Sequence, residues 1–87
     1  MTLESVPGLG PVTVEKLRKV GIESIDQLEE IGSMNAFLMV REMVDKGACL
    51  SFLYGLEGAV QKKRSKELSP DTKEKLRKFV RSLDQEQ

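Results

Sequence analysis

The stretch VPGLGPVTVEKLRKVGI, residues 6–22, decides how the first quarter of the chain folds. It places Gly8 and Gly10 two residues apart and follows them directly with Pro11. Proline is favoured at the first position of a helix because the N–H that it lacks would be unpaired there. A helix is therefore expected from Pro11 to Gly21, because glycine takes the left-handed conformation that commonly ends a helix.

The glycine-rich turn in front of this helix predicts a hairpin. Glycine supplies backbone angles that other residues avoid, and Leu9 is expected to point into the core as an anchor. Where a hairpin runs into the first turn of a helix, unpaired N–H groups and the positive end of the helix dipole form a natural phosphate site. The predicted contacts with a nucleic-acid backbone are Gly8, Gly10, Val12, Thr13 and Lys16.

A second interpretation of the hairpin is a rigid corner that binds no ligand. Hairpins that bind DNA often carry a basic residue just after the glycines, where this chain has Val12. The helix before the hairpin, with Thr2 as its candidate N-cap, is only one turn long. Lys16, Arg18 and Lys19 are also ordinary complements of a helix C-terminus. Both interpretations stay open.

Composition limits the fold and the chemistry. Of the 87 residues, 39% are hydrophobic and only 5% aromatic, which favours a single aliphatic all-α domain over residues 1–87. The chain has no histidine and therefore lacks the commonest general base and metal ligand. We expect neither an enzyme nor a cofactor or metal site.

The single cysteine and the hydropathy indicate where the protein works. Cys49 lies among apolar residues and is expected to be a buried structural thiol. No segment has the length and hydropathy of a membrane span, and no secretory signal is present. We therefore expect a cytoplasmic protein without a membrane partner.

Four more helices with short loops are expected after the hairpin. Ser24 and Gln27 have the spacing of a capping box, and Gly32 is expected to end the helix that they begin. Ser33 is expected to cap the next helix, which Gly47 would terminate.

Residues 49–60 have the clearest helical periodicity in the chain. Gly55 and Gly58 lie inside this helix at a cost near ~1 kcal/mol each, which indicates that another backbone approaches closely. Ser69 and Pro70 begin the last helix, and a polar tail is expected at about residues 84–87. The predicted core residues are Phe37, Val40, Phe52, Leu53 and Leu56.

Glu57 falls at the edge of the apolar stripe of residues 49–60, between Leu53 and Val60. A carboxylate so close to a core needs hydrogen-bond partners. We predict that it accepts N–H groups from a neighbouring loop and locks two elements together. The alternative is a solvated glutamate at the border of the stripe.

Charge is balanced overall but unevenly distributed. Residues 23–45 carry six acids and one base, a net charge of −5, whereas residues 62–81 carry nine bases and three acids, a net of +6. The second segment is a candidate nucleic-acid surface, and the alternative is a solvated polar face. Its candidate contacts are Lys62, Lys63, Arg64, Arg77 and Arg81.

Three pieces of the sequence carry a family resemblance: the hairpin, GIESIDQLEEIG at residues 21–32 and LYGLEGA at residues 53–59. Together they resemble the C-terminal domain of the TfoX/Sxy family, bacterial regulators of DNA uptake and natural transformation. The resemblance covers roughly residues 6–60. It implies about five short helices in a compact helix-hairpin-helix (SAM-like) domain, with the hairpin unit at about residues 2–22.

The resemblance implies a regulatory role in competence or transcription. Regulators of this family carry a separate N-terminal domain, for which this chain has no room. It is either a stand-alone version, which the capped turn at its start favours, or an excised domain. One function is weak, non-specific binding of duplex DNA. The other is docking of a second regulatory protein, which the neutral net charge favours. The expected oligomeric state is a monomer or a weak dimer.

Overall fold

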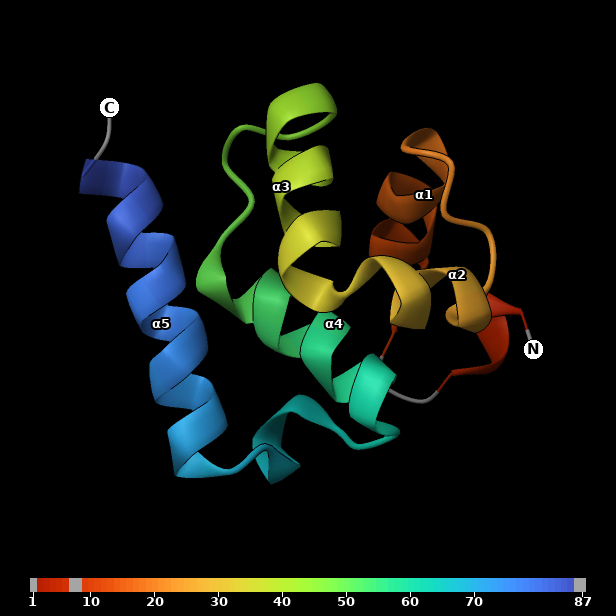
Figure 1. Cartoon of the computed structure of the whole chain (residues 1–87). Helices are drawn as coiled ribbons and strands as arrows, with labels where there is room; N and C mark the ends of the chain where they lie inside the picture. Colours follow the sequence, from red (N-terminus) through yellow and green to blue (C-terminus); the bar gives the residue numbers. More distant parts are fainter. Residues whose placement is uncertain (1, 7–8, 86–87) are drawn as a thin grey trace.

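The chain forms an all-α fold, as expected (Figure 1). The computed structural model describes residues 2–6 and 9–85. Within these residues there is no strand, and a single isolated bridge joins Thr2 and Ser24. The elements, in chain order, are the 3₁₀ turn η1 (Leu3–Ser5), α1 (Pro11–Lys19), α2 (Ile25–Ile31), α3 (Ser33–Met43), α4 (Leu50–Gln61), the 3₁₀ turn η2 (Ser65–Glu67) and α5 (Pro70–Gln85).

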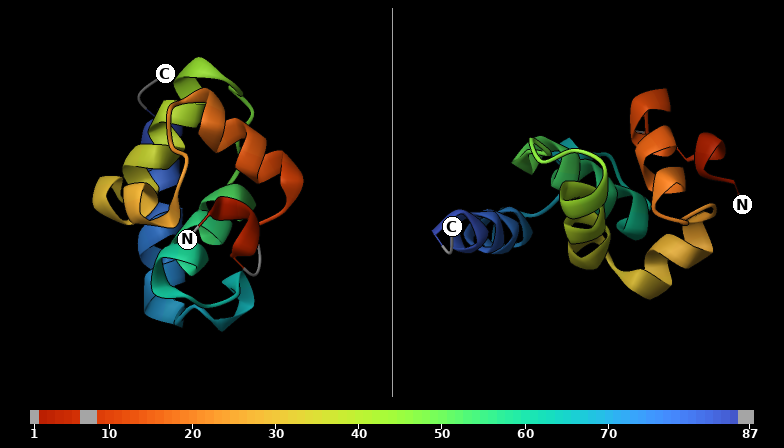
Figure 2. Two further views of the ribbon diagram at one scale, coloured as in Figure 1. Left: turned by 90° about the vertical axis from the view of Figure 1, so that its right-hand side faces the viewer. Right: turned by 90° about the horizontal axis from the view of Figure 1, so that it is seen from above.

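The centre of the fold is the pair α3 and α4, with α1 and α2 on one side and α5 on the other (Figure 1). The view from above in Figure 2 shows α5 at one edge of the molecule. Four of the five predicted core residues are buried, and the fifth, Phe52, is half-buried. The four are Phe37, Val40, Leu53 and Leu56. None of the described helices has the length and apolar character needed to cross a membrane.

Both predicted ends of α1 are confirmed. The helix begins at Pro11, and Gly21 has φ +85°. The N–H of Ile22 donates to the carbonyl of Leu17, and the N–H of Gly21 to that of Arg18, both at 3.0 Å. These two bonds form a Schellman motif, which returns the buried Ile22 to the core.

The first two helix starts differ in part from the predictions. Thr2 makes no capping bond to the backbone, because its hydroxyl instead pairs with the Ser5 hydroxyl at 3.0 Å. Ser24 does cap α2 by accepting from the N–H of Gln27 at 3.2 Å. The Gln27 side chain accepts from the N–H of Glu23, at 2.6 Å, so only one half of the predicted capping box forms.

The predicted limits of α3 are wrong at both ends. Gly32, with φ +90°, links α2 directly to α3, and Ser33 is the buried first residue of α3 and not its cap. The helix ends at Met43, and in the loop beyond it the Asp45 carboxylate accepts from the N–H of Gly47 at 2.9 Å. Gly47 therefore belongs to the loop that the aspartate organises.

The two glycines of α4 have different roles. A Cβ on Gly58 would lie 2.7 Å from the carbonyl oxygen of Lys63, which confirms the predicted close approach of another backbone. The chain turns back there because Lys62 adopts φ +61° and the N–H of Lys63 donates to the Gly58 carbonyl at 2.7 Å. A Cβ on Gly55 would meet nothing within 4 Å, so the prediction is wrong for Gly55.

The last helix begins as predicted and ends later. Ser69 accepts from the N–H of Thr72 at 3.1 Å, and Pro70 is the first residue of α5. The helix runs through Asp84 to Gln85, and Arg41 of α3 forms an ion pair with Asp84. The predicted polar tail at residues 84–87 is thus wrong for its first two residues, and its last two lie outside the described residues.

Candidate nucleic-acid interface

The hairpin leads into α1 through Leu9 and Gly10. Leu9 is half-buried against the core, as an anchor would be, and its N–H donates to the carbonyl of Val6 at 3.3 Å. Gly10 occupies the N-cap position of α1. Gly8, the other predicted phosphate contact, lies outside the described residues. Among residues 2–6, the described part in front of Leu9, the structure has the 3₁₀ turn η1 and no α-helix.

Gly10 does not need to be glycine for conformational reasons. Its φ of −81° is open to any residue, and a Cβ built on it would meet nothing within 4 Å. The expectation that this glycine supplies forbidden backbone angles is wrong. Glycine is among the residues favoured at an N-cap, and its bare backbone at a helix start is also one that a ligand can approach closely.

The first turn of α1 supplies the remaining predicted N–H donors. Helix geometry leaves the first N–H groups without intrahelical partners, those of Val12 and Thr13 among them. Val12 is 63% exposed and Thr13 half-buried. The apolar Val12 side chain therefore stands in solvent at the position where a basic residue would strengthen phosphate binding.

Each cation of α1 forms an ion pair with an acidic side chain. Lys16 pairs with Asp45 at 2.6 Å and lies over the Phe52 ring, 5.7 Å from its centroid. Its hydrogen bond to Asp45 lowers the pKa of that carboxyl. On the same helix Arg18 pairs with Glu4, and Lys19 with Glu15 at 3.3 Å. Each pairing reduces the positive charge that the hairpin side offers to a phosphate.

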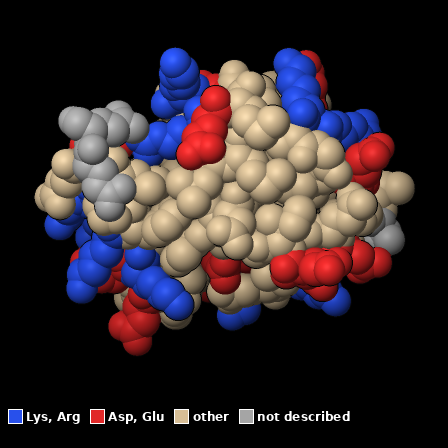
Figure 3. All heavy atoms as spheres, turned by 45° about the horizontal axis from the view of Figure 1, so that its top comes forward, with Lys and Arg blue, Asp and Glu red and all other residues tan. Residues whose placement is uncertain are grey.

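The cations after α4 are less constrained. Lys62, Lys63 and Arg64 are exposed, and no ion pair involves them among the described residues. Figure 3 shows several basic side chains at the left of the molecule, over α5. Within α5, Arg77 pairs with Glu74 at 2.9 Å, while Arg81 is exposed and outside the ion pairs found in the described part of the chain.

Glu57 forms the lock that the sequence predicted, with different donors. Its carboxylate accepts from the Ser33 hydroxyl at 2.5 Å and from the Gln61 side-chain amide at 2.6 Å. The bond from Ser33 ties α4 to the start of α3, while the bond from Gln61 lies within α4. Sequence reasoning missed Ser33, because serine after Gly32 also fits a helix cap, and only the packing of α3 on α4 shows its partner.

Cys49 is exposed, so the prediction of a buried thiol is wrong. It lies at the N-cap of α4, where the backbone N–H of Phe52 lowers the pKa of the thiol. Across residues 2–6 and 9–85 there is no cluster of three His, Cys, Asp or Glu side chains that could hold a metal ion.

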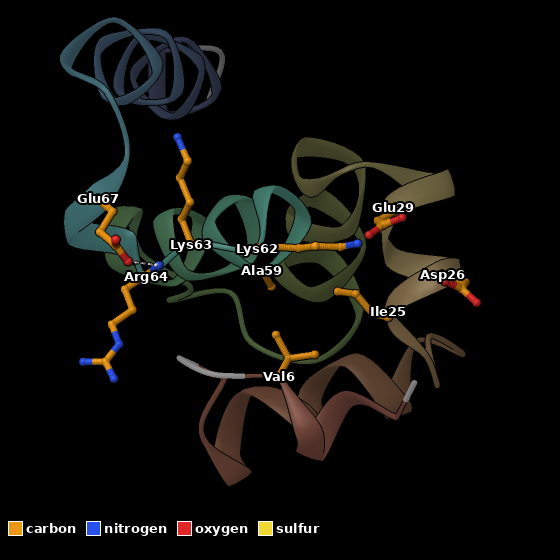
Figure 4. Close-up of a pocket in the computed structure, with 9 residues that line it drawn as sticks. All are labelled: Val6, Ile25, Asp26, Glu29, Ala59, Lys62, Lys63, Arg64 and Glu67. Carbon is orange, nitrogen blue, oxygen red and sulfur yellow. Dashed lines mark hydrogen bonds between the residues drawn. The ribbon is translucent and has the colours of Figure 1, made fainter.

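Sequence reasoning also missed a pocket of about 570 Å³ (Figure 4). Val6, Ile25 and Ala59 form an apolar floor, and charged side chains of α2 and of the segment after α4 form the walls. No motif marks it, because its lining comes from four separate parts of the chain.

These features define a small all-α domain with an open helix start at Gly10, exposed bases at Lys62, Lys63 and Arg64 after α4, and a charge-lined pocket. The chain belongs to the TfoX C-terminal domain family, whose sequence model matches residues 1–80. The DNA transformation protein TfoX of Haemophilus influenzae is 38% identical over 81 residues. The match covers 93% of this chain but only 37% of that protein.

Two solved structures share the fold closely. A triclinic crystal structure of an uncharacterized protein from Listeria monocytogenes has a TM-score of 0.92 and 40% identity, over 97% of this chain and 94% of that one. A tetragonal crystal structure of a Listeria monocytogenes protein of unknown function has a TM-score of 0.89 and 42% identity, over 93% and 98% of the two chains. The expected family is therefore confirmed, and it is associated with DNA transformation.

Proposed function

We propose that this domain is a non-enzymatic regulatory module of competence that contacts the DNA backbone weakly and without reading sequence. One observation carries the proposal: the cations of α1 are paired with acids, whereas Lys62, Lys63, Arg64 and Arg81 are exposed and outside the observed ion pairs. Unpaired exposed cations attract phosphates at the lowest cost, because no existing ion pair has to break.

The basic segment would be the main contact, and the hairpin a second one. Gly10 supports a role for the hairpin, because its backbone is open and the fold does not require a glycine. Val12 and the pairing of Lys16 with Asp45 weaken the hairpin as a site on its own. The module would act on transcription. We place it in the cytoplasm, where Cys49 would stay reduced.

The affinity should be low. Non-specific complexes have dissociation constants on the order of 10⁻⁴ to 10⁻⁶ M at physiological salt. Neutralising about four phosphates gives a slope of log affinity against log salt of about −3 to −4, whereas a hairpin alone, with about two or three phosphates, gives about −2 to −3.

The test is fluorescence anisotropy of a labelled mixed-sequence duplex across a salt series. Arg64→Glu with Arg81→Glu, which reverses two of the exposed cations outside the ion pairs, should remove most binding, while the matched control Arg18→Glu with Lys19→Glu on α1 should change it much less. Gly10→Ala reports on the hairpin, because alanine fits φ −81° and the fold should survive. If the α1 reversals abolish binding and the reversals of Arg64 and Arg81 do not, the hairpin is the site and the proposed basic surface is wrong.

A second function, docking of another regulatory protein, is favoured by the charge-lined pocket and the neutral net charge. Neutral chains attract DNA poorly at long range. If the wild-type domain shows no DNA binding even at low salt, protein docking replaces DNA binding as the proposed function.

A further inference from the structure

The pocket of Figure 4 has the size and floor of a binding site. Its volume of about 570 Å³ lies within the range of pockets that hold ligands. The side chains of Val6, Ile25 and Ala59 point toward one another across the hollow (Figure 4). An apolar group that entered there would replace water on an apolar surface, which favours binding.

The two walls carry opposite charges. Asp26 and Glu29 of α2 form one wall. The other wall has three bases, Lys62, Lys63 and Arg64, and one acid, Glu67, which accepts from the N–H of Arg64 at 2.9 Å. No ion pair within 4.0 Å joins the walls among the described residues. The complementary occupant is an apolar side chain with a base on the α2 side and an acid on the other side.

The chain itself presents such a group at the end of α3. Met43 is 70% exposed, the most exposed of its large hydrophobic side chains in the described residues. It lies between Glu42 and Lys46, both exposed and outside the ion pairs found for residues 2–6 and 9–85, whereas Arg41 and Asp45 already have partners. Methionine is adaptable and is used often at binding surfaces.

We propose that the pocket receives Met43 from a second copy of this chain, with Glu42 facing Arg64 and Lys46 facing Asp26. Figure 1 places the end of α3 at the top of the molecule and the segment after α4 at the bottom, so Met43 cannot fill the pocket of its own chain. The contact joins two different surfaces, so it either closes into a reciprocal dimer or a ring or leaves a free Met43 and a free pocket at the two ends of an open assembly.

Such a contact is weak and sensitive to salt. One inserted side chain with exposed charged neighbours gives a small interface of the transient kind. Its ion pairs are exposed, so they are screened as ionic strength rises. The pocket shares Lys62, Lys63 and Arg64 with the surface proposed for DNA. The self-association is measured without DNA, so this proposal does not rest on DNA binding.

Complementation tests it. Met43→Asp replaces the inserted apolar side chain and leaves the pocket intact. Asp26→Lys with Glu29→Lys reverses the charge of the acidic wall and leaves Met43 intact. All three positions are exposed, so the variants should fold. By sedimentation at low salt, the mean mass of wild type should rise with concentration from 9.8 kDa, while each variant stays monomeric. A 1:1 mixture of the two variants should form dimers and nothing larger.

Matched controls separate the contact from general charge effects. Met43→Leu keeps an apolar group, and Glu23→Lys with Glu30→Lys changes the same charge beside and within α2 but outside the pocket lining. Both controls should associate as wild type does. In NMR, ¹⁵N-labelled Met43→Asp should show shifts at Ile25 and Ala59 when unlabelled pocket variant is added.

Three results would overturn the proposal: a wild type that stays monomeric at every concentration, a mixture of the variants that stays monomeric, or shifts that lie away from the pocket. A Met43→Asp variant that associates as wild type does would have the same consequence.

Discussion

Gly55 and Gly58 lie three residues apart in α4 and should respond to alanine in opposite directions. Both are helical, so alanine gains about 1 kcal/mol of helix propensity at each position. At Gly55 a Cβ meets nothing within 4 Å, so the gain is kept. Gly55→Ala should therefore raise the free energy of unfolding by about 1 kcal/mol, which in a domain of this size raises the melting temperature by about 4–8 °C.

At Gly58 the same methyl group has no room. It would lie 2.7 Å from the backbone oxygen of Lys63 and 3.2 Å from the backbone nitrogen of Ser65. Backbone cannot rotate away as a long side chain can, so the turn after α4 must move. Overpacking costs about 1–3 kcal/mol, and loss of the Lys63–Gly58 backbone hydrogen bond about 1 kcal/mol more. After the propensity gain, Gly58→Ala should lose about 1–3 kcal/mol.

Urea unfolding followed by circular dichroism at 222 nm measures both variants. The two free energies should differ by about 2–4 kcal/mol with an unchanged m-value, since the surface exposed on unfolding stays the same. If Gly58→Ala is as stable as Gly55→Ala, the backbone after α4 does not press on the helix as described. A destabilised Gly55→Ala would mean that the space beside Gly55 is filled.

Four further variants and one reactivity measurement test other contacts. Leu56→Ala should cost about 2–5 kcal/mol in urea unfolding, and a loss under about 1 kcal/mol would place Leu56 outside the core. Glu57→Ala should cost about 1–3 kcal/mol by leaving its donors unpaired, and Glu57→Gln less, because its amide oxygen still accepts; equal stabilities would mean a solvated side chain. Asp45 has a lowered pKa in the folded state, so its contribution to stability is present above its unfolded pKa of 3.8 and is lost as pH falls through the folded value. The free energy of unfolding of Asp45→Asn should therefore depend less on pH below about 4 than that of wild type. The same pH dependence for both proteins in this range would contradict the prediction. Cys49 should react with a thiol reagent in the folded protein, and reaction only after urea is added would contradict its exposure.

The parts of the fold that the sequence predicts correctly depend on local chemistry. Pro11 begins α1 because of its own ring, Gly21 ends the helix by its own φ, and Ser69 caps α5 through an N–H three residues away. Each signal needs only a few neighbouring residues. The family could also be predicted, because LYGLEGA at residues 53–59 is a local pattern.

The predictions that fail needed long-range information. Ser33 resembles a cap until α4 brings Glu57 beside it, 24 residues further along the chain. Gly55 and Gly58 are equivalent in a helical pattern, and only the turn at Lys63 distinguishes them. The exposure of Cys49 and the lining of the pocket depend on how the helices pack, so hydropathy along the chain could not supply them.

Ion pairing explains why a chain with zero net charge still offers charged surfaces. Each pair in the described residues joins an acid and a base at one place, as Lys16 and Asp45 do between α1 and the loop after α3. Such pairs cancel charge locally, so neither side chain is free to bind a charged group of another molecule. The exposed acids of α2 gather at the lower right of Figure 3. Neither these acids nor the cations of residues 62–64 form an ion pair within the described residues. Because the Debye length is only about 8 Å at physiological salt, a partner at the surface responds to these separated groups and not to their sum. Arginine and lysine reversals at different places should therefore have different effects, even though each changes the net charge by the same amount.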